Sequence, residues 1–210
     1  TFCPLMLAHP IEEGELAALD PADFAAEWKW DGIRVQIVAR GSGKRLYSRA
    51  GEDIGGSFPE LVEALPDDVV LDGELLVVRG GEVAPFNDLQ QRLNRKTPSL
   101  KMMSDYPAAV CLYDMLEERG EDLRGLAFRE RRARLETWYR AAPRPRLDLS
   151  PMVPFESWDE LAALRAQTRA NGIEGLMLKR VDSVYVPGRP KGQWWKLKRA
   201  PLTVDAVLMY

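Results

Sequence analysis

The sequence predicts a fold that mixes β-strands with α-helices, and three observations support this prediction. Apolar and polar residues alternate over 33–37, a pattern typical of a half-buried strand. Two apolar runs, 69–78 and 108–116, have the length and composition of buried strands. A capping box that begins at Ser157 predicts a helix over 157–171. The chain has 210 residues, enough for one large or two small domains.

The composition of the chain argues against several classes of protein. The net charge of -3 argues against a uniformly basic nucleic-acid coat, so any nucleic-acid contact must come from a local patch. Cys3 and Cys111 lie far apart, which predicts neither a disulfide framework nor a zinc site and favours a reducing, intracellular setting. His9 is the single histidine and is interpreted as a loop residue. No membrane span or signal peptide is visible, and the first residue, Thr1, suggests an excerpt from a longer protein.

The stretch 27–34 sets a lysine between two acids. If it is extended, Glu27, Lys29 and Asp31 share one face and two tryptophans share the other. Arg34 adds a cation suited to bidentate phosphate contacts. The alternative interpretation is an ordinary amphipathic strand whose charges are solvated.

A β-hairpin is predicted next. The alternating strand turns at 41–43 and returns over 46–49. Arg49 ends the returning strand, where it is either a solvated charge or part of a binding site. Ser57 is then the expected N-cap of a short helix, with Glu60 in the capping-box position.

The apolar run 69–78 contains two carboxylates. A buried charge is costly without a partner, so both need an explanation. Asp72 is interpreted as a structural residue that pairs with an arginine. Glu74 is expected to face a cleft, where it would bind hydroxyl groups or a cation.

Short helices are predicted over 86–93 and 100–103, on either side of a basic loop, 92–96, that is expected to be solvated. The predicted strand 108–116 contains one aromatic residue, Tyr113, which belongs either to the core or to a base-stacking platform. The charged helix 126–140 is expected to form a solvated outer layer.

The C-terminal part supplies an acid and two lysines. Glu174 lies near the start of a predicted strand, where it could be a simple strand-edge charge. Lys196 and Lys198 share one face of the last strand. Two lysines so placed repel each other unless an anion lies between them, which suggests a phosphate.

Six short motifs follow one another along the chain. In this order the sequence resembles the adenylation domain of ATP-dependent DNA ligases, in the covalent nucleotidyltransferase superfamily that also holds RNA ligases and mRNA capping enzymes. Each motif alone is weak, but six in the family's order are a strong signal. The resemblance runs from the apolar arm 4–8 to Lys198. The motifs are K-x-D-G-x-R (29–34), S-R-x-G (48–51), D-G-E-L (72–75), Y-D-x-L (113–116), E-G-L-M-L-K (174–179) and W-K-L-K (195–198).

The resemblance implies an α+β fold of two largely antiparallel β-sheets flanked by helices, with the nucleotide site between them. Residues 1–199 would be the adenylation domain, and 200–210 the linker and truncated start of a C-terminal OB-fold domain. Lys29 would attack the α-phosphate of ATP to give lysyl-AMP. A free lysine has a pKa of about 10.4, so attack near pH 7 requires a pKa lowered by about 3 units. Lys196, Lys198 and a divalent cation would act in that direction, whereas Asp31 acts against it and would orient the amine or bind metal or ribose.

The resemblance also implies roles for the other residues. Glu27 would lie against the adenine edge, and Tyr113, where the family often has Phe, would stack on its ring. Glu74 would take a ribose hydroxyl, and Glu174, with Glu74, would hold Mg²⁺ or Mn²⁺. Contacts with ribose, triphosphate or the 5′-phosphate of the nick are implied for the remaining cations: Arg34, Arg49, Arg189, Lys196 and Lys198.

The implied reaction is sealing of nicked double-stranded DNA by a monomer in the cytoplasm or bacterial nucleoid. Two alternatives remain at this point. The chemistry could act on RNA ends instead, although the W-K-L-K ending favours DNA. The chain could also be a non-catalytic nucleotide- or nucleic-acid-binding module, which the set of candidate partners around Lys29 disfavours. NAD is a less expected donor than ATP, because Arg34 resembles the ATP-dependent pattern.

Overall fold

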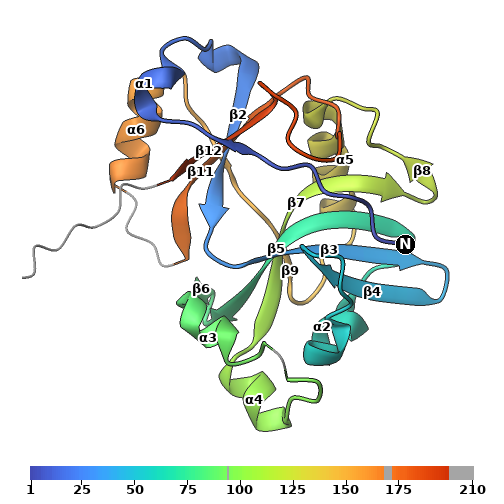
Figure 1. Cartoon of the computed structure of the whole chain (residues 1–210). Helices are drawn as coiled ribbons and strands as arrows, with labels where there is room; N and C mark the ends of the chain where they lie inside the picture. Colours follow the sequence, from blue (N-terminus) through green and yellow to red (C-terminus); the bar gives the residue numbers. More distant parts are fainter. Residues whose placement is uncertain (94, 168–171, 199–210) are drawn as a thin grey trace, which may run out of the picture.

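The computed structural model describes residues 1–93, 95–167 and 172–198, whose strands form two sheets (Figure 1). The first sheet has the order β1-β12-β11-β2-β10. Its strands are β1 (His9–Pro10), β2 (Phe24–Trp30), β10 (Met152–Val153), β11 (Ile173–Arg180) and β12 (Trp194–Lys198). The second has the order β4-β3-β5-β7-β8, with β6 paired to β5 and β9 to β7. Its strands are β3 (Ile33–Arg40), β4 (Gly43–Ser48), β5 (Val69–Arg79), β6 (Glu82–Val83), β7 (Ala108–Glu118), β8 (Glu121–Asp122) and β9 (Leu147–Leu149).

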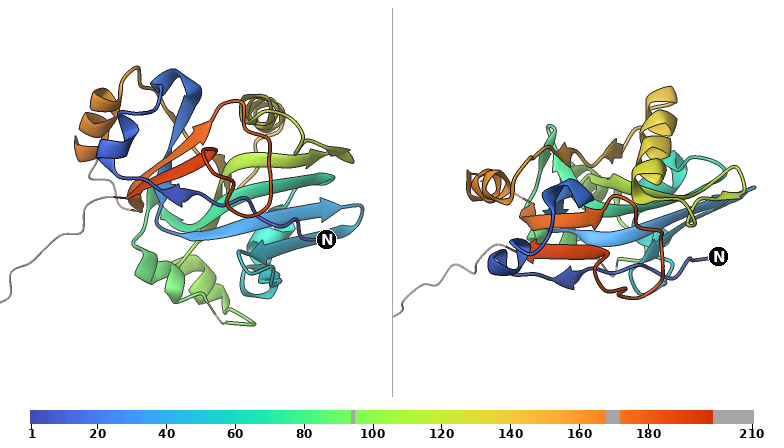
Figure 2. Two further views of the ribbon diagram at one scale, coloured as in Figure 1. Left: turned by 45° about the horizontal axis from the view of Figure 1, so that its top comes forward. Right: turned by 90° about the horizontal axis from the view of Figure 1, so that it is seen from above.

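Helices cover the outer faces of the sheets. Figure 2 shows α1 and α6 together at the end of the molecule that holds the first sheet. Leu61 of α2 and Leu135 of α5 are buried in the core of the second sheet. The helices are α1 (Glu13–Leu16), α2 (Pro59–Ala64), α3 (Phe86–Gln90), α4 (Leu100–Asp105), α5 (Phe128–Ala141) and α6 (Trp158–Gln167), with 3₁₀ turns at Pro21–Asp23 and Gly55–Ser57. The predicted α+β class and its two largely antiparallel sheets are therefore confirmed.

The first sheet aligns three motifs side by side. In its register Lys29 of β2 lies opposite Gly175 of β11, which in turn lies opposite Lys198 of β12. Gly175 cannot be replaced without a shift, because an added Cβ would lie 2.2 Å from the backbone oxygen of Leu197. The register of antiparallel strands thus brings residues more than 140 positions apart onto one face of the sheet.

The turn after β2 carries the chain from the first sheet to the second. Gly32 occupies this turn, and an added Cβ there would lie 2.5 Å from the backbone oxygen of Leu75. Only a glycine allows so close an approach of two backbones. Beyond the turn, β3 and β4 form the predicted hairpin, and Arg34 lies opposite Glu74 of β5. Lys29 and Arg34 consequently stand on different sheets although they are five residues apart.

A third apolar cluster lies where the two sheets meet. Met6 and Val70 are fully buried in it, together with Tyr185 and Trp194, which are 4% and 1% exposed. Met6 comes from the apolar N-terminal arm, which bridges to Gly188 of the loop before β12. Burial of these large side chains holds the two sheets together, because each contributes about 1.5–3 kcal/mol.

Some local expectations were wrong. Ser57 does not cap α2; the N-cap position is Phe58, and the Glu60 carboxylate binds Arg92 instead. Arg92, expected in a solvated loop, is fully buried. The helix α5 is not merely a solvated layer, because Arg131 and Arg132 are buried. His9 lies in the short strand β1 and not in a loop.

The N-cap expected at Ser157 is confirmed, and two other expectations lie outside the described residues. Cys3 and Cys111 are free. Ser157 caps α6 through the backbone N–H of Glu160, at 3.2 Å, but the end of that helix, 168–171, lies outside the described residues. The same holds for 199–210, the stretch interpreted as a linker and OB-fold start. No helix in the described part of the chain is long and apolar enough to cross a membrane.

Candidate active site

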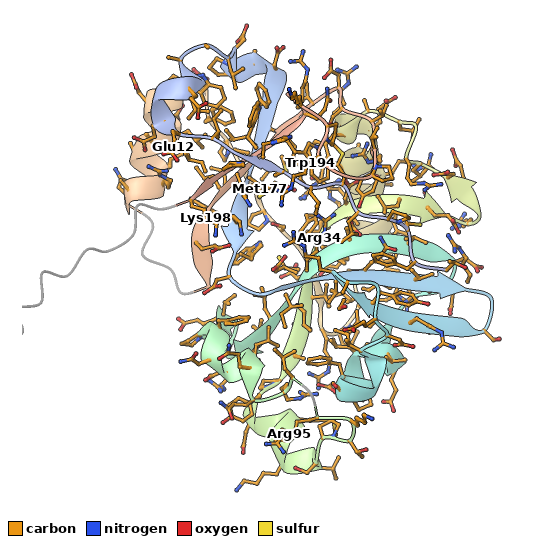
Figure 3. The ribbon with its side chains drawn as sticks, viewed as in Figure 1. Glu12, Arg34, Arg95, Met177, Trp194 and Lys198 are labelled. Atoms are coloured by element: carbon orange, nitrogen blue, oxygen red, sulfur yellow. The ribbon has the colours of Figure 1, made fainter. Side chains whose placement is uncertain are left out.

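A cavity of about 420 Å³ lies between the two sheets. Its wall contains ten of the residues predicted to bind nucleotide or metal, which come from six strands and two loops. In Figure 3, Met177 and Lys198 of the first sheet lie across from Arg34 of the second. The predicted residues in the wall are Glu27, Lys29, Arg34, Arg49, Glu74, Tyr113, Glu174, Arg189, Lys196 and Lys198.

Asp31 is the one predicted catalytic residue that is not part of the cavity wall. It follows β2, is exposed, and donates its backbone N–H to the carbonyl of Gly172 at 2.7 Å. It still acts on Lys29 through its charge, since it raises the pKa of that lysine. The contribution of its carboxylate is therefore electrostatic and comes from the rim of the cavity.

Lys29 has a lowered pKa, as a nucleophilic amine requires. Burial is the largest cause, because removing the ammonium from water disfavours its charge. Glu74 acts in the opposite sense, while Lys198 and Lys196 lower the pKa further. Neighbouring cations, which the sequence suggested as the cause, thus rank below desolvation. The amine also forms an ion pair with Glu174.

Cations line one side of the cavity. The pKa of Lys196 is lowered, first by burial and then by the positive charges of Arg189, Lys198 and Arg49. Lys198 lies 3.8 Å from Glu174, which it shares with Lys29. One carboxylate does not balance this many cations, so an anion of several charges, such as a polyphosphate, fits the electrostatics of this side.

The carboxylates of the site fit a metal ion that is held mainly by its substrate. Burial raises the pKa of Glu74 to about 7, against the opposing effect of Lys29 and Arg34. No group of three or more acidic, histidine or cysteine side chains is gathered for a metal among the described residues. Mg²⁺ in nucleotide sites is commonly bound by one or two carboxylates plus phosphate oxygens, a role that Glu74 and Glu174 could fill.

An aromatic end of the cavity surrounds a buried ion pair. Glu27 is 2% exposed, and one of its oxygens lies 2.6 Å from Nζ of Lys179. The other accepts a hydrogen bond of 3.2 Å from Arg132 of α5. Nζ of Lys179 also lies 4.6–4.7 Å from the ring centroids of Tyr113, Phe128 and Trp194. Glu27 is therefore paired with two cations, Lys179 and Arg132, at this end of the cavity.

Arg34 is largely committed to the protein itself. It donates to Asp72 at 2.6 Å, to the carbonyl of Met6 at 2.7 Å and to the hydroxyl of Tyr185 at 3.1 Å. Asp72 is fully buried, so its predicted pairing with an arginine is confirmed. This network ties both sheets and the N-terminal arm together directly beneath the cavity.

Comparison with known proteins identifies the family. The family described as ATP dependent DNA ligase domain matches residues 5–198. This chain belongs to the ATP-dependent DNA ligase family. A DNA ligase of Archaeoglobus fulgidus is 33% identical over 98% of this chain, and a DNA ligase of Thermococcus fumicolans is 35% identical over 97%. Our ligase-family chain spans 37% of the length of each.

Solved structures agree with this assignment. A mycobacterial DNA ligase D complexed with ATP and MES superposes with a TM-score of 0.72 at 32% identity, covering 93% of this chain and 60% of that one. The ATP-dependent DNA ligase from bacteriophage T7 in complex with ATP gives a TM-score of 0.66 at 26% identity, over 93% of this chain and 68% of that one. Both are similar to our chain across almost all of its length.

The sequence did not single out two residues of the site in this ligase-family chain. Lys179 was quoted only as the end of a motif, although it lines the cavity and is 2% exposed. Arg132 was grouped with a solvated helix. A signal existed for Lys179, because a lysine within an apolar strand needs an acidic partner. None existed for Arg132, whose partner Glu27 lies 105 positions away.

Proposed function

We propose that this chain is the adenylation domain of an ATP-dependent DNA ligase, with Lys29 as its nucleophile. The neutral amine attacks the α-phosphate of ATP, a P–N bond forms, the bond to the β-phosphate oxygen breaks, and pyrophosphate leaves. The AMP then passes to the 5′-phosphate of a nick, and attack by the 3′-hydroxyl releases AMP and seals the strand. The main support is one observation: a lysine with a lowered pKa stands in a cavity lined with cations.

One end of the cavity would bind the phosphates of the nucleotide, and the other end would bind its base. Lys196, Lys198 and Arg49 would hold the phosphates, and Lys29 faces the same space. At the other end, Glu27 is an acceptor and Lys179 a donor. This pair complements the Watson–Crick edge of adenine, whose amino group donates and whose ring nitrogen accepts. Guanine presents the opposite pattern, so we expect ATP to be the preferred donor.

A divalent cation, Mg²⁺ or Mn²⁺, is part of the proposal. It would neutralise charge on the phosphates, and Glu174 and Glu74 are the residues placed to hold it. Nicked double-stranded DNA is the proposed substrate, and we propose an intracellular enzyme that acts as a monomer. The longer relatives leave room for the proposed C-terminal OB-fold domain, a module whose surface commonly binds nucleic acid.

The proposal is tested in two stages. Incubation with α-labelled ATP or GTP and Mg²⁺ should give a labelled protein from ATP in preference to GTP. Addition of nicked DNA should then move the label to the 5′-phosphate, and an RNA nick serves as the comparison. Absence of covalent label with either nucleotide would contradict the proposal, and transfer only to RNA ends would favour the RNA-ligase alternative.

The pKa of Lys29 should respond in opposite directions to two substitutions. Glu74 raises this pKa and Lys198 lowers it. Glu74→Gln should therefore move the titration of the amine to lower pH, and Lys198→Ala should move it to higher pH. The measurement is the pH dependence of Lys29 modification by an amine-specific reagent without ATP, read by peptide mass spectrometry. The pKa of Glu74 is itself about 7, so its carboxylate is charged mainly above that pH. The effect of Glu74→Gln on the pKa of Lys29 should therefore appear above pH 7. Equal midpoints in all three proteins would refute this electrostatic account.

Removal of the Tyr113 ring should weaken ATP binding. The ring forms part of the cavity wall, and Lys179 and Arg34 lie 4.7 Å and 5.9 Å from its centroid. Tyr113→Ala should cost about 1–3 kcal/mol of ATP affinity, the range for stacking of a base on an aromatic side chain. Tyr113→Phe keeps the stacking face and should bind almost as wild type. Calorimetric titration measures this affinity. Unchanged affinity in a folded alanine variant would show that Tyr113 is a core residue and not a base-stacking platform.

A further inference from the structure

Three cations without acidic partners stand together outside the cavity. Arg95, Lys96 and Lys101 are exposed, and among the described residues no carboxylate forms an ion pair with any of them. They belong to the described part of 86–105, here named the basic lobe, which contains α3 and α4. Exposed arginines elsewhere often have a partner, for example Arg45 with Asp53 and Arg140 with Glu136.

The charge of the basic lobe contrasts with that of the chain. The net charge of the whole protein is -3, whereas the lobe has more cations than carboxylates. One of its two acids, Asp88, pairs with Arg79, so in the described part of the lobe only Asp105 remains without an ion pair, compared with three exposed cations. Such a local surplus is the patch that an acidic chain needs to contact a polyanion.

Buried contacts hold the basic lobe in a fixed place. Arg92 is fully buried and binds both oxygens of Glu60, at 2.7 and 3.0 Å, as well as the carbonyl of Ser57 at 2.8 Å. Pro98 is buried as well, and the carbonyl of Lys96 lies 3.5 Å from the position of a Cβ on Gly56. The loop backbone is therefore pinned at both ends while its cationic side chains face solvent.

The basic lobe connects to the rim of the cavity. Its chain follows β6, whose Val83 packs against Gly172, and Gly172 accepts the backbone N–H of Asp31. Figure 3 shows Arg95 at the end of the lobe remote from Arg34 and Lys198. The chain that leads into the lobe thus lies near Asp31 at the rim of the cavity, and the lobe extends away from there, as a support for a long ligand would.

We propose that the basic lobe binds the phosphate backbone of duplex DNA flanking the nick. This inference rests on the proposed function and extends it to a second contact surface. Duplex DNA carries one negative charge per about 1.7 Å of its axis, so a duplex with its nick at Lys29 presents phosphates along the lobe. Arg95, Lys96 and Lys101 contact these phosphates without reading sequence.

The test compares two triple variants with equal net charge. Arg95→Ala/Lys96→Ala/Lys101→Ala removes the patch, and Arg45→Ala/Arg129→Ala/Arg140→Ala removes three exposed cations from β4 and α5. Binding to a nicked duplex is measured over a salt series, and self-adenylation by ATP is measured in parallel. The lobe variant should bind about tenfold or more weakly at 0.1 M salt. Its slope of log affinity against log salt should fall by about 1 for each lost contact.

The outcomes separate the two proposals. Normal self-adenylation with weakened, less salt-dependent DNA binding in the lobe variant alone supports the inference. Equal loss in both triple variants shows an effect of net charge and overturns it, as does wild-type binding by the lobe variant. Absence of self-adenylation in the unmodified protein would instead contradict the proposed function. Single substitutions at Arg95, Lys96 and Lys101 keep the test valid if the triple variant does not fold.

Discussion

Replacement of Lys29 by alanine should abolish the covalent AMP formed with ATP. The lysine amine is the only nucleophile in the proposed first step, so no residual labelling is expected. In the unmodified protein the adduct should be stable to alkali and lost in acid or hydroxylamine, as a P–N bond is. Electrophoresis after incubation with α-labelled ATP measures the adduct, and peptide mass spectrometry locates it.

Two controls sharpen this result. Lys29→Arg retains a positive charge but supplies no neutral amine near pH 7, so it should also remain unlabelled. Lys44→Ala removes a lysine of β4 that pairs with Asp67, outside the cavity, and should label as wild type. Label retained in Lys29→Ala, or found on another peptide, would disprove the assignment of the nucleophile.

Loss of the Asp114 carboxylate should have the largest effect on stability. Asp114 of β7 and Arg131 of α5 are both fully buried, with hydrogen bonds of 2.8 and 3.0 Å between them. Arg131 also donates to the carbonyls of Leu126 and Ser183. Asp114→Ala leaves a buried guanidinium without its counter-charge, so the free energy of unfolding should fall by about 3–5 kcal/mol. Urea denaturation provides the measurement.

The contrast with an exposed pair tests the physical reason. The side chain of Arg140 is 70% exposed in its ion pair with Glu136, so Arg140→Ala should change stability by no more than about 1 kcal/mol. The double variant Asp114→Leu/Arg131→Met, which removes both charges, should recover much of the loss. If Asp114→Ala were no more harmful than Arg140→Ala, the buried pair would not stabilise the fold as argued.

Much of the site was predictable because its residues sit in short local patterns. Strand alternation places Lys196 and Lys198 on one face whatever surrounds them, and the cost of burying acids singled out Asp72 and Glu74. The order of the six motifs then predicted the α+β fold, and all ten expected binding residues line one cavity.

The local pattern could not predict ion-pair and hydrogen-bond partners that come from distant parts of the chain. Arg92 looked solvated because Glu60, its partner, lies 32 positions earlier. Arg34 looked free for a phosphate, yet Asp72 and Tyr185 bind it from another strand and another loop. Both cases have one cause: an ion pair depends on distance in space, which sequence separation does not measure.

The sequence by itself singled out the residues that we propose carry the chemistry: the lysine between two acids, Glu74 of β5 and the lysine pair of β12. The tertiary structure alone decided how these groups behave. Two sheets, joined through Gly32, close over Lys29 and desolvate it, and burial becomes the largest cause of its lowered pKa. The same packing places Lys179 and Arg132 on Glu27. Desolvation and ion pairing both arise from the assembled neighbourhood, which exists only once strands far apart in sequence have come together.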